Sequence, residues 1–141
     1  MIHADLHTSN IMASRDKMKV IDMEFAFMGP FGYDLGYLVG NLISQYCAAC
    51  FKRFPSEQSR KQFKAYLLAT IKSLIETYMK TFTLCWEKSV KERYRGQQGL
   101  LQSILQEVME DVPGYASMVN WFRSVSEIPY PDFDIIEDKD A

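Results

Sequence analysis

The order of apolar and polar residues predicts a short β-rich head. Two runs with β-branched and apolar residues, NIMAS and KMKVIDMEF, are separated by the polar RDK and predict a small hairpin. The following segment, AFMGPFGY, contains two glycines and a proline, which are typical of a loop. We therefore expect residues 1–34 to form a head without regular helix.

A helical body is predicted after the head. Asp34 stands directly before an apolar stretch and is expected to cap a helix from about residue 35 to 51. The segment RFPSEQS then interrupts the chain with a stop and restart signal. Over residues 63–82, apolar side chains recur at three- and four-residue intervals, which predicts an amphipathic helix packed on the core.

Two further helices complete the predicted body, which spans residues 35–126. The polar EKSVKERYRGQQG ends the second helix, and a third is expected from about residue 101 to 112, ended by the dipeptide PG. A fourth is expected from about residue 115 to 125. The remaining residues, 127–141, contain two prolines and several acidic side chains and predict an extended surface tail. The predicted fold is mainly α, with one hairpin and about four helices.

Composition excludes several classes of protein. The chain has 141 residues, 48% of them hydrophobic, and a formal net charge of -2 without a long run of one sign. A nucleic-acid-binding surface is therefore not expected, and the apolar DLGYLVGNLISQYCAACF is too short and polar to cross a membrane. The three cysteines and the lack of a secretory pattern favour the reducing cytoplasm. We interpret the pair in CAAC as small core residues one helical turn apart.

The residues that carry chemistry lie in the head. Asp5 precedes Asn10, and Asp22 and Glu24 end the second predicted strand. Phosphoryl transfer needs a carboxylate that orients and deprotonates the attacking hydroxyl, and oxygen ligands for the Mg²⁺ that neutralises the nucleotide phosphates. A hairpin between Asn10 and Asp22 would bring its two ends together. The sequence thus predicts a site where an amide oxygen and carboxylates face one metal ion.

A family resemblance rests on these motifs. HADLHTSNI resembles the catalytic loop of the aminoglycoside phosphotransferase and choline kinase group, small-molecule kinases with the protein-kinase fold. VIDMEFAFMGPFGYDLG is similar to the methylthioribose kinases of that group, with their Asp-x-Glu motif followed by Phe-Ala-Phe and Gly-Pro. FTLCWEK, EVMEDVPGYASMV and DFDIIED resemble the helical C-terminal lobe of that family in order and spacing. The resemblance implies a kinase-like C-terminal lobe that uses ATP and Mg²⁺.

The resemblance also implies roles for individual residues. Asp5 would be the catalytic base and would contact the substrate hydroxyl. Asp22, Met23 and Glu24 would form the ATP-binding segment, with Asp22 and Glu24 acting through Mg²⁺. Asn10 would be a further metal ligand in the wider group, although methylthioribose kinases often carry serine there.

Two residues depart from the family pattern. Ala4 stands where the family has glycine, which is tolerable if the backbone there does not need a positive φ. The family also has two adjacent arginines that hold the acceptor, and here Phe122 and Arg123 occupy those positions. Arg123 alone would then bind substrate. Structural roles are expected for His3, which would support the loop, and for Asp34, which would cap its helix and brace the loop.

The parts of a kinase that bind ATP from the N-terminal lobe are missing from this sequence. No glycine-rich loop, strand lysine or hinge is present, so we expect the N-terminal lobe to be absent, or supplied in cis or by a separate chain. The isolated chain should then be inactive. Three functions stay open: a lobe of a kinase that phosphorylates S-methyl-5-thioribose in methionine salvage, another small-molecule kinase for choline, aminoglycosides or other sugars, or a non-catalytic relic. A homodimer is possible, as in the family.

Overall fold

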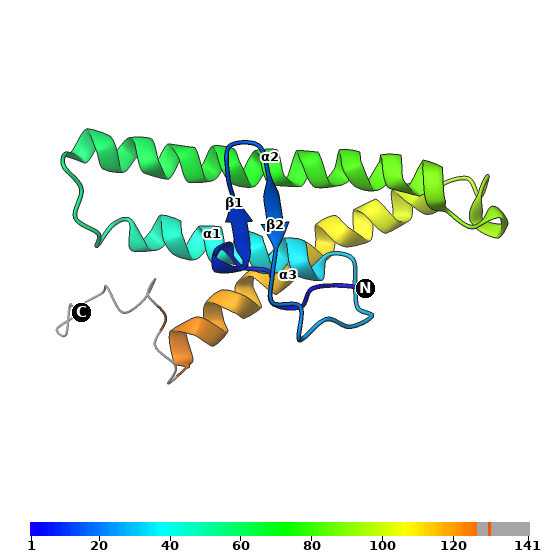
Figure 1. Ribbon diagram of the computed structural model, residues 1–141, viewed down its shortest axis with the longest axis horizontal. Coiled ribbons are helices and arrows are strands. Elements are labelled where there is room, and N and C mark those ends of the chain that lie inside the picture. The colour runs from blue at the N-terminus through cyan, green and yellow to red at the C-terminus, as the bar shows by residue number, and fades with distance from the viewer. Residues whose placement is uncertain (127–129, 131–141) are drawn as a thin grey trace.

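A computed structural model describes residues 1–126 and Tyr130. The fold is mainly helical, with one small antiparallel sheet that lies in front of a long helix (Figure 1). In chain order the elements are η1 (Thr8–Asn10), β1 (Ile11–Ala13), β2 (Met18–Val20), α1 (Tyr33–Ala48), α2 (Glu57–Ser89), η2 (Glu92–Tyr94) and α3 (Leu100–Val125). The strands pair with Ile11 opposite Val20 and Ala13 opposite Met18. The prediction of a mainly helical chain with one strand pair is therefore confirmed.

A stripe of glycines on one side of α1 brings this helix close to α3. A Cβ atom added at Gly36 would lie 2.6 Å from the Tyr115 Cβ and 2.9 Å from the Val112 carbonyl oxygen. At Gly40 the added atom would lie 2.8 Å from the Ala116 carbonyl oxygen. Because these contacts are to backbone or to the first side-chain atom, they cannot be relieved by rotating a flexible side chain. At these two glycines, α1 therefore lies directly against the backbone of α3.

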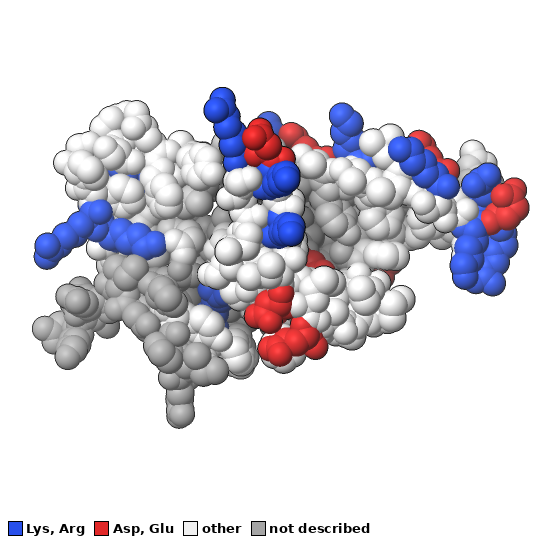
Figure 2. Space-filling model, viewed as in Figure 1, with Lys and Arg blue, Asp and Glu red and all other residues white. Residues whose placement is uncertain are grey.

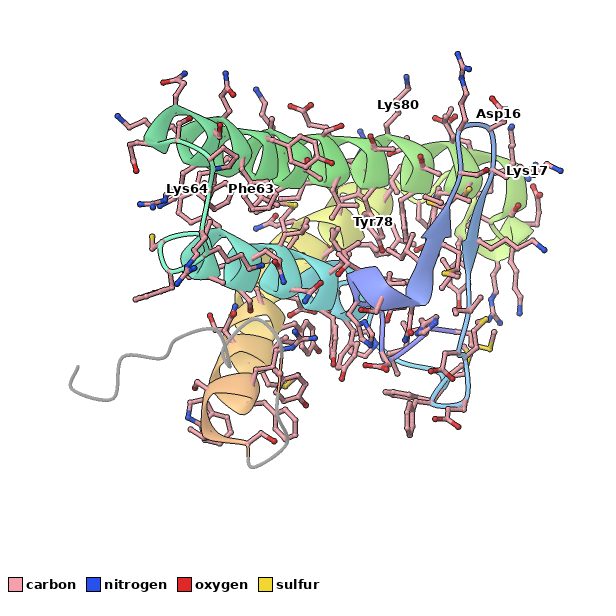
Figure 3. All side chains as sticks on the ribbon, turned by 60° about the vertical axis from the view of Figure 1, so that its left-hand side comes forward. Asp16, Lys17, Phe63, Lys64, Tyr78 and Lys80 are labelled. Atoms are coloured by element: carbon pink, nitrogen blue, oxygen red, sulfur yellow. The ribbon has the colours of Figure 1, made fainter. Side chains whose placement is uncertain are left out.

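The hydrophobic core lies along this crossing. It consists of five buried residues, two from α1 and three from α3: Leu35, Val39, Val108, Val112 and Ala116. Helix α2 covers the core with partly buried side chains, among them Ile75 and Tyr78. Figure 3 shows Tyr78 on the inner side of α2 and Lys80 pointing away from it. The Tyr78 hydroxyl donates a hydrogen bond of 2.7 Å to the Phe31 carbonyl, which ties α2 to the loop before α1.

The predicted third and fourth helices are one helix. Helix α3 runs without interruption from Leu100 to Val125, with Pro113 inside it. Proline removes one backbone donor, a loss that usually ends or kinks a helix. Here Val112 and Ala116, on either side of Pro113, are both 4% exposed because both pack against the glycine stripe of α1. This tertiary packing outweighs the local signal of the PG dipeptide.

Two further expectations concern the cysteine pair and the C-terminal tail. The interpretation of Cys47 and Cys50 as core residues is wrong, because both are exposed. The end of α1 instead turns Ala48 and Ala49 inward, at 1% and 0% exposure, which places the flanking cysteines outside. The extended acidic tail predicted for residues 127–141 lies outside the described residues, apart from Tyr130.

Charged side chains are interspersed over the surface. Figure 2 shows Lys and Arg among Asp and Glu on the visible face, with extended uncharged areas between them. Among the helices of the described residues, none combines the length and the apolar character that a membrane crossing requires.

Candidate active site

The buried imidazole of His3 links the first loop to the end of β2. Its Nε2 donates to the Ile21 carbonyl at 2.8 Å, and its Nδ1 accepts from the Asp5 backbone N–H at 3.3 Å. A carbonyl can only accept and an N–H can only donate, so both bonds require the same neutral tautomer. The ring thus holds the backbone of Asp5 next to the residue that precedes Asp22.

Asp34 braces the same loop but does not cap its helix. The N-cap of α1 is Gly32, and Asp34 lies in the first turn. Its carboxylate accepts from the backbone N–H groups of His3 at 2.6 Å and Ala4 at 2.9 Å. The expected cap is therefore wrong, because the carboxylate turns to the loop, whose two N–H groups need partners in a partly buried place.

Ala4 adopts a strained backbone conformation. Its φ angle is 71°, in the left-handed region that glycine enters at little cost and other residues avoid. The backbone at residue 4 therefore does need a positive φ, so alanine in place of the family glycine is not harmless. The two hydrogen bonds to Asp34 hold the loop in this shape in spite of the strain.

Ala4→Gly is expected to stabilise the chain by about 0.5–1 kcal/mol. Relief of the left-handed strain contributes about 1–2 kcal/mol, and the greater flexibility of glycine in the unfolded chain takes back about 0.5–1 kcal/mol. Urea unfolding followed by circular dichroism measures this change. The matched control is Ala65→Gly in the exposed part of α2, which should destabilise by about 1 kcal/mol. A loss of stability in both variants would contradict the assigned strain.

Asp5 and Asn10 lie in direct contact. The Asn10 side-chain Nδ2 donates to the Asp5 backbone carbonyl at 3.0 Å and to its carboxylate Oδ2 at 3.3 Å. The His7 Nε2 also lies 3.4 Å from the same Oδ2. Because Asn10 points its amide nitrogen at Asp5, its Oδ1 atom is the one that could serve as a metal ligand.

The backbone brings Asn10 beside Asp22. The Ile21 N–H donates to the Asn10 carbonyl at 3.0 Å, which continues the β1–β2 ladder by one residue toward Asp22. Asp22 has a φ of 67°, a conformation that aspartate tolerates better than most residues. Met23 and Glu24 follow in an exposed turn, which the Ala26 N–H closes onto the Met23 carbonyl at 3.1 Å.

The structure brings the end of β2 close to Asn10 but, in the part of the chain that it describes, shows no bond among the predicted metal-ligand side chains. The Ile21 N–H bonds to the Asn10 carbonyl directly before Asp22, whereas within the described residues no hydrogen bond or ion pair joins the Asp22 or Glu24 side chain to Asp5 or Asn10. In the same part of the chain, no three side chains among His, Cys, Asp and Glu form a potential metal-binding group. One amide oxygen and up to two carboxylates still fit Mg²⁺, which prefers oxygen ligands and keeps several waters.

A pocket of about 490 Å³ opens beside Asp5. It brings Asp5 together with Arg123 of α3, although these residues are far apart in the sequence. Arg123 is 8% exposed, and its guanidinium lies over the Tyr130 ring at 4.9 Å from the centroid. Lys52, in the segment after α1, also lines the pocket and donates to the Gln45 Oε1 at 2.6 Å.

Sequence reasoning missed the polar face of α1 that lines this pocket. Tyr37, Asn41 and Gln45 are spaced by four residues and therefore share one side of the helix. The Asn41 Oδ1 accepts from the Thr8 N–H at 3.1 Å and from the Thr8 hydroxyl at 2.9 Å, which fixes the loop after Asp5. The spacing of these polar residues in an otherwise apolar helix was the available signal.

Tyr37 lines the pocket together with Asp5 and Arg123. Burial, followed by the nearby Asp5 carboxylate, raises the pKa of Tyr37 to about 12, against a smaller opposing effect of Arg123. The phenol is therefore neutral at physiological pH. A larger and mostly apolar cavity of about 750 Å³ between the helices contains none of the predicted site residues.

Comparison with known proteins shows the family of this chain. Residues 1–75, which include Asp5, Asn10, Asp22, Tyr37 and the loop between them, match the model of the phosphotransferase enzyme family. The chain belongs to that family. The prediction from HADLHTSNI and the motifs that follow it is thus confirmed for this phosphotransferase family member.

Curated relatives of this phosphotransferase chain are methylthioribose kinases. That of Geobacillus thermodenitrificans is 34% identical over 140 residues, and that of Exiguobacterium sibiricum is 31% identical over 138 residues. The matches cover 99% and 98% of this chain and 33% of each relative. The methylthioribose kinase of Pectobacterium atrosepticum is 30% identical over the whole chain, which covers 35% of its length. The chain therefore spans about a third of the curated relatives it matches.

Proposed function

We propose that this chain is the C-terminal, catalytic-loop lobe of a cytoplasmic ATP-dependent kinase that phosphorylates a hydroxyl of 5-methylthioribose. In this proposal Asp5 is the base that orients and deprotonates the acceptor hydroxyl. The observation that carries the proposal is the pocket that brings Asp5 to Arg123, within a chain that is about a third identical to methylthioribose kinases. Arg123 contributes a donor for the acceptor.

Asn10 and Asp22 are the metal ligands we propose first, with Glu24 as a further ligand. When bound, Mg²⁺ supplies positive charge that neutralises the nucleotide phosphates. The contact of Asn10 with both Asp5 and the strand end before Asp22 supports this assignment, because it couples the base to the ligands. Met23 lies between the two carboxylates in the proposed ATP-binding segment.

The charges of the pocket favour a neutral acceptor. Lys52 and Arg123 both line it, and Asp5 is its one acidic side chain among the described lining residues. Choline and aminoglycosides are cations, and a cation placed beside two basic side chains is repelled. A neutral sugar lacks this penalty. The alternative kinase for cationic acceptors is therefore less well supported than methylthioribose.

The head also exposes an apolar surface that suits a second lobe. Large side chains of the strands and the loop after them are about half exposed or more: Met12, Met18, Met23, Phe25, Phe27 and Met28. The relatives contain about two thirds of their length beyond the matched region. We propose that an N-terminal, ATP-gripping lobe covers this surface, in cis or as a separate chain. A non-catalytic relic would not need an apolar surface for an ATP-binding lobe.

A chimera tests the acceptor class. In it, this chain replaces the matched third of the Geobacillus thermodenitrificans methylthioribose kinase. We expect kcat/KM for 5-methylthioribose to exceed that for choline or kanamycin by about 100-fold or more, because the like-charge contacts cost several kcal/mol. Lys52→Gln should reduce the discrimination against choline. A preference of the chimera for either cation would overturn the proposed acceptor.

A further inference from the structure

A second pocket adjoins the candidate active site, and we call it the aromatic pocket. Its volume is about 440 Å³, and its walls include Ala4 of the loop, Tyr37 of α1 and both Phe122 and Arg123 of α3. Tyr37 and Arg123 also line the polar pocket that contains Asp5. Ala4 directly precedes Asp5 in the chain. The two pockets therefore lie side by side at the proposed base.

The chemistry of the aromatic pocket differs from that of the polar pocket. Arg123 is the one charged side chain among its described lining residues. The others are small, aliphatic, aromatic or thioether side chains, among them Tyr33, Met118 and Trp121. Aromatic side chains offer large apolar contact areas and also attract thioether sulfur atoms. The pocket therefore suits an uncharged apolar group, and a thioether in particular.

The wall on the side of α3 presents exposed apolar side chains. Met118 is 43% exposed, Trp121 65% and Phe122 51%. Large apolar side chains that gather beside a few polar groups are typical of a ligand-binding surface. Their exposure leaves apolar area that a bound alkyl chain would cover.

The opposite walls are fixed by contacts with other parts of the chain. The centroid of the Tyr33 ring lies 6.2 Å from that of Tyr37 and 4.9 Å from that of Tyr115. On the loop side, the Ala4 N–H donates to the Asp34 Oδ1 at 2.9 Å. Walls that are ordered before a ligand arrives reduce the entropy that binding costs. The aromatic pocket therefore has a defined shape on these sides.

We infer that the aromatic pocket binds the substituent on the sulfur of the acceptor, and that the acceptors are 5-alkylthioriboses whose affinity rises as the alkyl chain grows beyond methyl. The inference rests on the proposed function. In such a sugar the alkylthio group extends from carbon 5, away from the hydroxyls, so a hydroxyl lies at Asp5 while the sulfur points into the adjoining pocket. A methyl group is close in size to a water molecule, which takes up about 30 Å³, so 440 Å³ leaves room for several more carbon atoms.

The first test measures binding by the chain itself. Trp121 lines the aromatic pocket, and the other tryptophan of the chain, Trp86, lines a different cavity. In the Trp86→Phe variant, the fluorescence of Trp121 therefore reports on this pocket alone. 5-(Butylthio)ribose should reach half-saturation at about a tenfold lower concentration than 5-methylthioribose, because each buried methylene group favours binding by about fourfold or less.

Ribose is the control for this titration, because it has the hydroxyls without the alkylthio group. It should give no saturable change in fluorescence over the same concentrations. Equal half-saturation for the butyl and methyl compounds, or no saturable change with either of them, would overturn the inference.

The second test uses the chimera. We expect kcat/KM for 5-(butylthio)ribose to exceed that for 5-methylthioribose by about tenfold, and Phe122→Ala should remove most of this preference. Phe51→Ala is the matched control. Phe51 is also 51% exposed, and it lies outside the described lining of both pockets. This variant should keep the preference for the longer chain.

The outcomes separate this inference from the proposed function. If the chimera phosphorylates 5-methylthioribose as well as or better than the butyl compound, the inference is wrong and the proposed function stands. The inference is also wrong if Phe122→Ala lowers the melting temperature and leaves the preference unchanged, because the aromatic pocket is then covered by protein. If the chimera phosphorylates neither sugar, the proposed function is wrong and the inference falls with it.

Discussion

Asp5→Asn is expected to lower kcat of the chimera by about 100-fold or more, with little change in the KM for ATP. Asparagine fills the same space and can still accept a hydrogen bond from Asn10, so the pocket should keep its shape. It cannot take up the proton of the acceptor hydroxyl, a contribution that general bases make mainly in the transition state. A coupled assay of ADP release measures the loss.

The matched control is Asp16→Asn. Asp16 lies at the tip of the hairpin, away from the pocket, where it is labelled in Figure 3. This variant removes the same charge and should retain kcat. Equal turnover of Asp5→Asn and Asp16→Asn would remove Asp5 from the role of base.

Gly36→Ala is expected to destabilise the chain by about 1–2 kcal/mol. The added methyl group would meet the Tyr115 Cβ at 2.6 Å and the Val112 carbonyl oxygen at 2.9 Å, so α1 and α3 must move apart. Such overpacking costs about 1–3 kcal/mol or more and outweighs the gain of about 1 kcal/mol that alanine brings to a helix. Because domains of this size are stable by only about 5–15 kcal/mol, the effect should be plain in urea unfolding.

Gly114→Ala provides a control of opposite sign. Gly114 lies in α3, and a Cβ atom added there would meet nothing within 4 Å. This variant should stabilise the chain by about 1 kcal/mol through helix propensity alone. If Gly36→Ala is as stable as Gly114→Ala, the close packing of α1 on α3 is wrong.

Elements with local signals were predicted well from the sequence. The restart at Ser56 is an example: its hydroxyl accepts from the Ser59 N–H at 3.1 Å and caps α2, as Ser-rich stops and starts often do. The strand pair also follows from short β-branched runs around a polar turn. These features depend on residues within a few positions of one another, so a single sequence contains the information.

Features that depend on long-range packing were not predicted. Pro113 continues a helix because residues on either side of it pack on α1, and Asp34 binds a loop about 30 positions earlier instead of its own helix. The glycines at positions 32, 36 and 40 recur every four residues, a spacing that is visible in the sequence and allows close helix packing, but the sequence does not say which helix lies against them.

The candidate site likewise contains contacts that are local in sequence and contacts that depend on long-range packing. Asp5 and Asn10 are near in sequence, and their contact follows from this short separation. Tyr37 on α1 and Arg123 on α3 line the same pocket as Asp5 because the glycine stripe sets the distance between these helices. A family pattern pointed to Arg123, whereas Tyr37 had no motif to mark it.

The central claim is that this chain is the catalytic-loop lobe of a methylthioribose kinase that needs a second, ATP-gripping lobe. The most direct measurement is ADP release with ATP, Mg²⁺ and 5-methylthioribose, recorded for the purified chain and for the chimera under the same conditions. The chain alone should give no turnover above background, because metal ligands without a nucleotide clamp cannot hold the γ-phosphate in line, and the chimera should turn over. Turnover by the chain alone, or a folded chimera without turnover, would contradict the claim.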